Sequence, residues 1–113
     1  MFGFFKRKAL KNIATNLYQE LVRGRIHEGT HYGLSADDIS EKTGLNLFSS
    51  RSLIHRLVAS GLVEEYDFLD VVCYRAVNVP IYLDETSSPN SILQYVKRAI
   101  ARVDFKGLTE SEY

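Results

Sequence analysis

The chain has 113 residues, enough for one domain with a core of its own. With 45% hydrophobic and 25% charged residues, its composition is that of a globular protein and excludes a disordered tail. One cysteine excludes both an internal disulfide and a four-cysteine zinc site. No stretch approaches the roughly 18 consecutive apolar residues of a membrane span, so we expect a cytoplasmic protein without a membrane contact.

Charge is balanced over the whole chain, with 14 basic and 14 acidic residues, but it is unevenly distributed. Residues 1–31 contain six basic and two acidic side chains, whereas residues 64–90 contain one basic and six acidic side chains. The balance excludes a uniformly basic protein that coats nucleic acid. The asymmetry can still orient a partner.

Apolar residues at three- and four-residue steps predict a first amphipathic helix over residues 6–26. The segment from Ser35 to Asp38 has the form of a capping box, which opens a helix. We therefore expect a short second helix over residues 36–42, ended by Gly44.

A third helix follows and should end at Gly61. Its core-facing side is predicted from four residues that share one helical face, namely Ser50, Leu53, Ile54 and Leu57. Two helices on either side of a turn at Gly44 have the order of a helix-turn-helix.

After the third helix the apolar period changes from that of a helix to that of a strand. Residues 62–67 and 71–77 predict a hairpin joined by the link 68–70. No Asn-Gly or Asp-Gly turn is present, so the register stays open. Pro80 confines residues 77–83 to a sheet edge or an extended crossing.

A last helix is expected over residues 91–103, after a loop at residues 87–90, and residues 104–113 should be frayed. Its apolar stripe, like that of the helix at residues 6–26, is too long for a three-helix core to cover completely. We therefore expect the two flanking helices to pair between copies, which predicts a homodimer.

The segment LSADDISEKTGLNLFSSRSLIHRLVASGLVEEY resembles a winged helix-turn-helix and is most similar to bacterial regulators of the MarR and PadR types. The matching features are the capping Ser35, the apolar Ile39 four positions later, the Gly44-Leu45 turn, and a closing Leu-x3-Gly-Leu-Val at residues 57–63. Ser50 departs from the pattern, because such proteins usually have Val or Ile there.

The resemblance implies a fold and a function. The fold is an α+β winged helix-turn-helix with an additional C-terminal helix, in a single domain over residues 1–113, with the helix-turn-helix and wing at about 34–77. The function is that of a small sequence-specific transcriptional regulator that binds double-stranded DNA, with the recognition helix in the major groove. Because no nucleophile with its base and no phosphate-binding glycine loop is evident, we expect neither an enzyme nor a cofactor.

The side of the third helix opposite its core face would contact the DNA. Six residues are predicted there, and they are Asn46, Ser49, Arg51, Ser52, His55 and Arg56. Arg51 could bind guanine O6 and N7 as a bidentate donor, and Asn46 or the serines could reach bases or phosphates. Arg56, one turn later, is better placed for a phosphate.

The predicted wing differs from a DNA-binding wing in its charge. It contains a single arginine, Arg75, and four acidic residues, namely Glu64, Glu65, Asp67 and Asp70. Acidic groups beside phosphates repel them, so either the wing stays clear of DNA or it binds protein. The alternative function is therefore a winged-helix adaptor that binds a protein through its acidic wing and the exposed Leu47-Phe48 pair.

Residues 27–31 read His-Glu-Gly-Thr-His, a literal match to H-E-x-x-H, in which two histidines on a helix share a zinc ion. Gly29 interrupts the motif, and the apolar stripe of the first helix has already stopped at Val22. We therefore expect a polar loop there and no metal site. Cys73 lies in an apolar strand and is expected to be a buried structural thiol.

Overall fold

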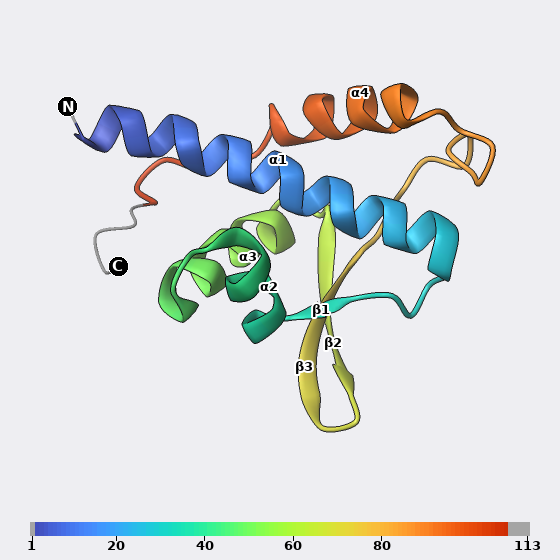
Figure 1. Cartoon of the computed structure of the whole chain (residues 1–113), viewed down its shortest axis with the longest axis horizontal. Helices are drawn as coiled ribbons and strands as arrows, with labels where there is room; N and C mark the ends of the chain where they lie inside the picture. The colour runs from blue at the N-terminus through green and yellow to red at the C-terminus, as the bar shows by residue number, and fades with distance from the viewer. Residues whose placement is uncertain (1, 109–113) are drawn as a thin grey trace.

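The computed structural model describes the backbone of residues 2–108 and the side chains of residues 9–108. Four helices and an antiparallel sheet with strand order β1-β3-β2 make up an α+β fold, as predicted. In chain order the elements are α1 (Phe2–Glu28), β1 (Leu34–Ser35), α2 (Ala36–Thr43), α3 (Leu47–Ala59), β2 (Val63–Phe68), β3 (Val71–Ala76) and α4 (Pro89–Ile100) (Figure 1).

Helix α1 is the central element of the fold. Figure 1 shows α4 on one side of it and α2, α3 and the β2–β3 hairpin on the other. The predicted apolar stripe is buried, with the side chains of Leu10, Ala14, Leu17, Tyr18, Leu21 and Val22 in the core. The helix extends beyond the predicted 6–26 at both ends. Gly24 lies within it, and the Tyr32 ring occupies the place where a Cβ at Gly24 would be, so the glycine permits close packing.

The boundaries of α2 confirm the capping prediction. The backbone N of Asp38 donates to Ser35 Oγ (3.1 Å), and the backbone N of Ser35 donates to Asp38 Oδ2 (3.0 Å). Gly44 ends the helix with a φ of 78°, in the left-handed region that favours glycine. Two helices separated by three residues result, and Ile39 is buried between them and the rest of the core.

The hairpin is one residue tighter than predicted. Strand β2 pairs with β3 from Val63 opposite Ala76 to Phe68 opposite Val71, so Phe68 belongs to the strand and the turn is Leu69-Asp70. Both turn residues have positive φ (51° and 66°), as a two-residue hairpin turn of type I′ requires.

Strand β1 was not predicted as a strand. Leu34 pairs with Tyr74 and Ser35 pairs with Cys73 of β3. Two residues are too few to show a period in sequence. The pairing joins the start of α2 to the hairpin.

Residues 77–88 cross from the hairpin to α4 without forming a strand. The crossing is not extended as predicted, because the backbone N of Leu83 donates to the Pro80 carbonyl oxygen at 3.0 Å and closes a turn there. Helix α4 begins two residues earlier than predicted, because Ser88 caps it and Pro89 occupies its first turn. It ends at Ile100 instead of Val103.

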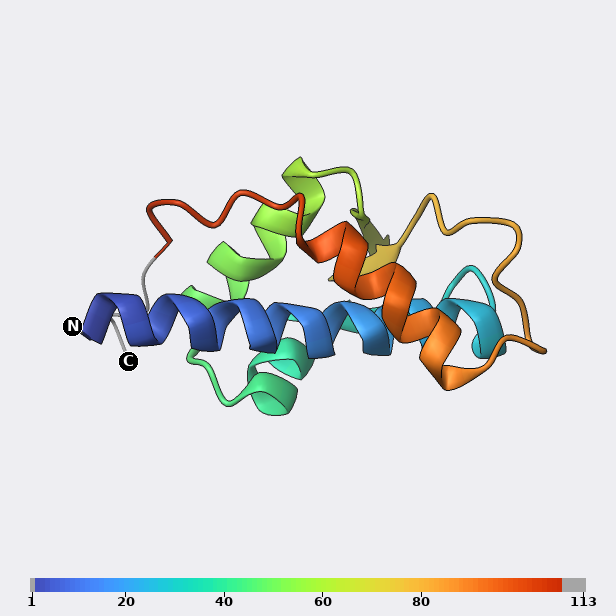
Figure 2. The same cartoon turned by 90° about the horizontal axis from the view of Figure 1, so that it is seen from above.

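Helix α4 packs on α1 within one chain, and Figure 2 shows it lying across α1. Its inward side chains are buried, and they are Ile92, Val96, Ala99 and Ile100. The hydroxyls of Tyr18 and Tyr95 are hydrogen-bonded at 2.9 Å across this contact, and burial together with this bond raises the pKa of Tyr18. The two stripes that predicted a homodimer therefore cover each other, so that argument for a dimer is wrong.

The segment after α4 also differs from the prediction of a frayed end. Val103 and Phe105 are buried, and Arg56 Nη1 on α3 donates to the Asp104 carbonyl oxygen at 2.8 Å. Residues 101–108 therefore pack against the core, while the remainder of the predicted frayed end, 109–113, lies outside the described residues. None of the helices in residues 2–108 is both long and apolar enough to cross a membrane.

Candidate nucleic-acid interface

Helix α3 has one buried face and one exposed face. The buried face contains Ser49, Ser50, Leu53, Ile54 and Leu57. On the other side Phe48, Arg51 and His55 are exposed, and Ser52 and Arg56 are half-buried. The predicted core face is confirmed, but the six residues predicted to contact DNA do not form one surface.

Ser49 is the first correction, because its side chain is only 2% exposed. It lies four residues before Leu53 and eight before Leu57, so all three fall on the same side of the helix. Among the described residues its hydroxyl has no hydrogen-bond partner. Ser49 therefore faces the core and cannot reach DNA from this position.

Asn46 takes a different role from the predicted contact with bases. It is the N-cap of α3, and its Oδ1 accepts a hydrogen bond from the backbone N of Ser49 at 2.8 Å. A capping side chain satisfies an amide that the helix leaves unpaired, and its rotamer is fixed by doing so. Only the Nδ2 group of Asn46 remains available to an external acceptor.

Arg56 also has an internal partner. Its bond to the Asp104 carbonyl oxygen holds the segment after α4 against the C-terminal part of α3. Arg56 lies in the last turn of α3 and is half-buried. It anchors the segment after α4, and the predicted contact with a phosphate stays a prediction.

Three of the six predicted residues remain together on the exposed face: Arg51, Ser52 and His55. Within the described residues Arg51 forms no ion pair. His55 lies edge-on to Tyr74 of β3, with 6.1 Å between ring centroids and 3.5 Å between Nε2 and the Tyr74 hydroxyl. Burial raises the pKa of Tyr74, the charge of Glu65 raises it further, and the charge of Arg51 lowers it. Arg51 and His55 therefore both lie close to Tyr74, and the exposed face of α3 borders the hairpin.

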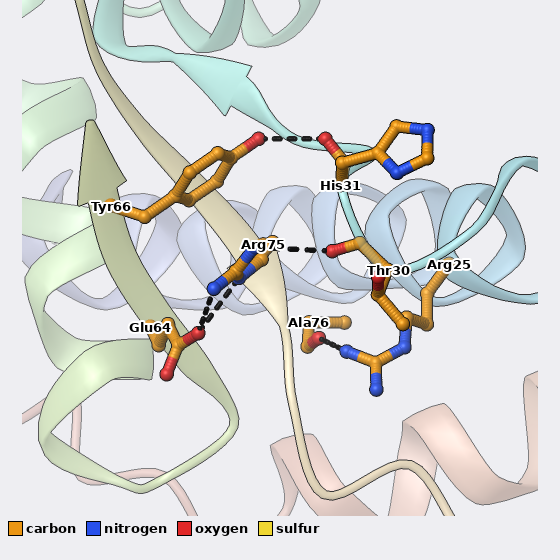
Figure 3. Close-up of polar contacts among 7 residues, drawn as sticks. All are labelled: Arg25, Thr30, His31, Glu64, Tyr66, Arg75 and Ala76. Atoms are coloured by element: carbon orange, nitrogen blue, oxygen red, sulfur yellow. Dashed lines mark hydrogen bonds and ion pairs between the residues drawn. The ribbon is translucent and has the colours of Figure 1, made fainter. Parts of the chain in front are cut away.

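The hairpin's arginine is bound internally. Figure 3 shows Arg75 held by Glu64, with Nη2 and Nε at 2.6 Å and 2.7 Å from Oε2, and Nη1 at 3.3 Å from the Thr30 carbonyl oxygen. Its guanidinium also lies over the Tyr66 ring, 4.3 Å from the centroid, and the Tyr66 hydroxyl donates to the His31 carbonyl oxygen. These contacts attach the hairpin to the loop after α1. They also pair the guanidinium that a DNA-binding wing would offer to a phosphate.

The tip of the hairpin exposes apolar and acidic side chains together. The exposed fractions are 52% for Phe68, 81% for Leu69, 49% for Val71 and 42% for Val72. The acidic residues beside them, Glu65, Asp67 and Asp70, are also exposed. Sequence reasoning identified the acidic groups but not the apolar tip, although a leucine in a hairpin turn was a visible signal.

The H-E-x-x-H segment is divided between a helix and a loop. His27 and Glu28 are the last residues of α1, whereas His31 follows the turn at Gly29, which has a φ of 113°. Among the described residues no three His, Cys, Asp or Glu side chains lie together as a metal site would require.

Cys73 is buried as predicted. Burial raises the pKa of its thiol, and the charges of Asp38 and Asp67 raise it further.

Comparisons with models of protein families, with curated proteins and with solved structures found no match to this chain.

Proposed function

We propose that this protein is a winged-helix transcriptional regulator, similar to the MarR and PadR types, that binds double-stranded DNA with α3 in the major groove. The observation that supports it best is the exposed face of α3. Two helices are joined by a turn at Gly44, and the second presents Arg51, Ser52 and His55 with no acidic residue anywhere between Leu47 and Ala59.

Arg51 is the principal base-reading group in this proposal, because its exposed guanidinium can donate two parallel hydrogen bonds to a guanine. Ser52 and the Nδ2 of Asn46 lie toward the same end of α3, where the helix dipole favours a phosphate. His55 follows Arg51 by about one turn and extends the contact along the groove.

The hairpin stays clear of the phosphates in this mode of binding. Glu65, Asp67 and Asp70 would be repelled by them, and Arg75 is paired with Glu64. The affinity must then come from α3 and from positive side chains elsewhere in the chain. A second copy would place two α3 helices about one DNA turn apart, so the homodimer remains a prediction, which sedimentation equilibrium would check.

The first prediction concerns Arg51. Once a preferred duplex has been selected from a random pool, Arg51→Ala should weaken binding to it by about 1–3 kcal/mol and relax one base position. The matched control is Arg23→Ala, which removes another exposed arginine, from α1, and should change the affinity only slightly. Fluorescence anisotropy at two salt concentrations measures both variants.

Two outcomes would contradict the DNA proposal. One is that no duplex is selected over scrambled sequence, and the other is that Arg51→Ala and Arg23→Ala lose the same affinity on every duplex. The second outcome would indicate a loss of general charge without sequence reading.

The second candidate function is a winged-helix adaptor that binds a protein through the hairpin. The specific observation in its favour is the apolar tip, where Phe68, Leu69, Val71 and Val72 are all exposed next to acidic groups. Phe48 on α3 is also exposed (58%), whereas Leu47 is half-buried. Leu69→Ser separates the two functions, since it should leave DNA binding by α3 unchanged and weaken capture of a protein by the hairpin.

A further inference from the structure

A large cleft lies where the C-terminal end of α3, the base of the hairpin, residues 78–82 and the C-terminal end of α4 meet. Arg56 Nη1 on α3 donates to the carbonyl oxygen of Asp104, in the segment that follows α4, and Figure 2 shows this segment running from the end of α4 past α3. The cleft volume is about 920 Å³, at the upper end of the range for small-molecule sites.

The cleft is basic. Arg56, Arg98 and Arg102 line it, and Asp104 is the acidic residue among its lining side chains. Asp104 Oδ1 already accepts a hydrogen bond from the backbone N of Lys106 at 2.8 Å. Within the described residues neither Arg98 nor Arg102 forms an ion pair. The three guanidinium groups and the one carboxylate leave a net charge of about +2 among the lining side chains. Such a cleft favours an anion that can accept several hydrogen bonds, such as a phosphate.

The remaining walls suit a planar ring. Tyr82 lines the cleft and is 64% exposed, so its ring face is available for stacking. Asn78 adopts a φ of 58° and donates from Nδ2 to the Gly61 carbonyl oxygen at 3.1 Å, which leaves its Oδ1 as an acceptor. The Tyr95 hydroxyl is already hydrogen-bonded to that of Tyr18.

We propose that this cleft binds a nucleoside phosphate, with the phosphates on Arg98 and Arg102 and the base on Tyr82. The volume exceeds what inorganic phosphate alone would fill, and the combination of guanidinium groups, an aromatic face and an amide acceptor matches the parts of a nucleotide. Arg56 of α3 and Arg98 of α4 both line the cleft, so the bound ligand would lie between the two helices. The site does not depend on DNA binding by α3.

Isothermal titration calorimetry with ADP as the probe tests the proposal on the full chain. Wild type should bind ADP at micromolar to millimolar concentration, inorganic phosphate more weakly, and adenosine more weakly still. The double variant Arg98→Ala, Arg102→Ala should lose roughly tenfold or more in ADP affinity, as expected when charged hydrogen-bond donors are removed. Both arginines are exposed, so the variant should remain folded.

Two controls separate the site from general charge and from the DNA surface. The pair Arg23→Ala, Lys97→Ala also removes two exposed cations, neither of which lines the cleft, and it should keep wild-type ADP affinity. Tyr82→Ala should weaken ADP binding and leave phosphate binding unchanged. The proposal is overturned if wild type does not bind ADP at millimolar concentration, if both double variants lose the same affinity, or if the arginine pair is instead required for binding duplex DNA.

Discussion

At Ser49 a polar side chain occupies a position in the apolar core. Its hydroxyl is buried beside Leu53 and Leu57 without a hydrogen-bond partner among the described residues. A buried hydroxyl that has lost its water costs roughly 1–3 kcal/mol, and serine is also a weaker helix former than alanine. The neighbouring Ser50, by contrast, has the Leu45 carbonyl oxygen at 3.5 Å from its Oγ.

We therefore predict that Ser49→Ala raises the free energy of unfolding by about 1 kcal/mol. The control is Ser40→Ala, which removes a donor to the Leu45 carbonyl oxygen (2.5 Å) and should lower the free energy of unfolding. Urea denaturation followed by circular dichroism measures both. A Ser49→Ala variant that is less stable than wild type would show that the hydroxyl has a partner, and the assignment of an unsatisfied group would then be wrong.

At the scale of elements, the hairpin turn contains two residues that are poorly suited to its backbone. Leu69 and Asp70 both have positive φ, and a branched apolar side chain in the left-handed region is costly. Asn-Gly is the favoured pair for this turn. We therefore predict that Leu69→Asn with Asp70→Gly stabilises the protein by about 1 kcal/mol.

Leu69→Ala is the control for this turn, because it removes the exposed apolar side chain but keeps the Cβ. Thermal unfolding should show a higher midpoint temperature for the Asn-Gly variant than for wild type. The alanine variant should have the same midpoint temperature as wild type. Equal gains in both variants would mean that exposed hydrophobic area, and not backbone conformation, limits the stability of the hairpin.

Elements with a period or a cap could be predicted from sequence, whereas pairings and exact faces could not. The Ser35–Asp38 box and Gly44 fixed both ends of α2 because capping is a local interaction. Strand β1 and the register of the hairpin depend on contacts between residues distant in sequence. Ser49 was placed on the wrong side of α3 because serine is compatible with either face and Ser49 lies at the edge of the core face, one residue before Ser50.

At the scale of the whole molecule, α1 and α4 illustrate the limit of a one-dimensional pattern. Their apolar stripes predicted correctly that each helix packs against another apolar surface. That surface was predicted to belong to a second copy of the chain. The structure shows that α4 covers α1 within the same chain, with Val96 and Ile92 buried. An apolar stripe does not indicate whether its partner lies in the same chain, so a dimer must now be argued from another surface.

A substitution in α4 tests whether this contact lies within one chain or between two. Val96 is fully buried, and a carboxyl group without a partner there costs several kcal/mol, a large part of the stability of a small domain. We therefore predict that Val96→Asp abolishes cooperative unfolding and, with it, any DNA binding, although α4 lies on the opposite side of α1 from α2 and the hairpin (Figure 1).

The control is Lys97→Asp, which places the same carboxylate on the exposed side of the same helix. It should remain folded and lose at most about 1 kcal/mol through its unfavourable position near the helix C-terminus. Circular dichroism and sedimentation equilibrium distinguish the two explanations. A folded Val96→Asp monomer derived from a wild-type dimer would mean that α4 covers α1 of a second copy, and the arrangement of helices within one chain would have to be revised.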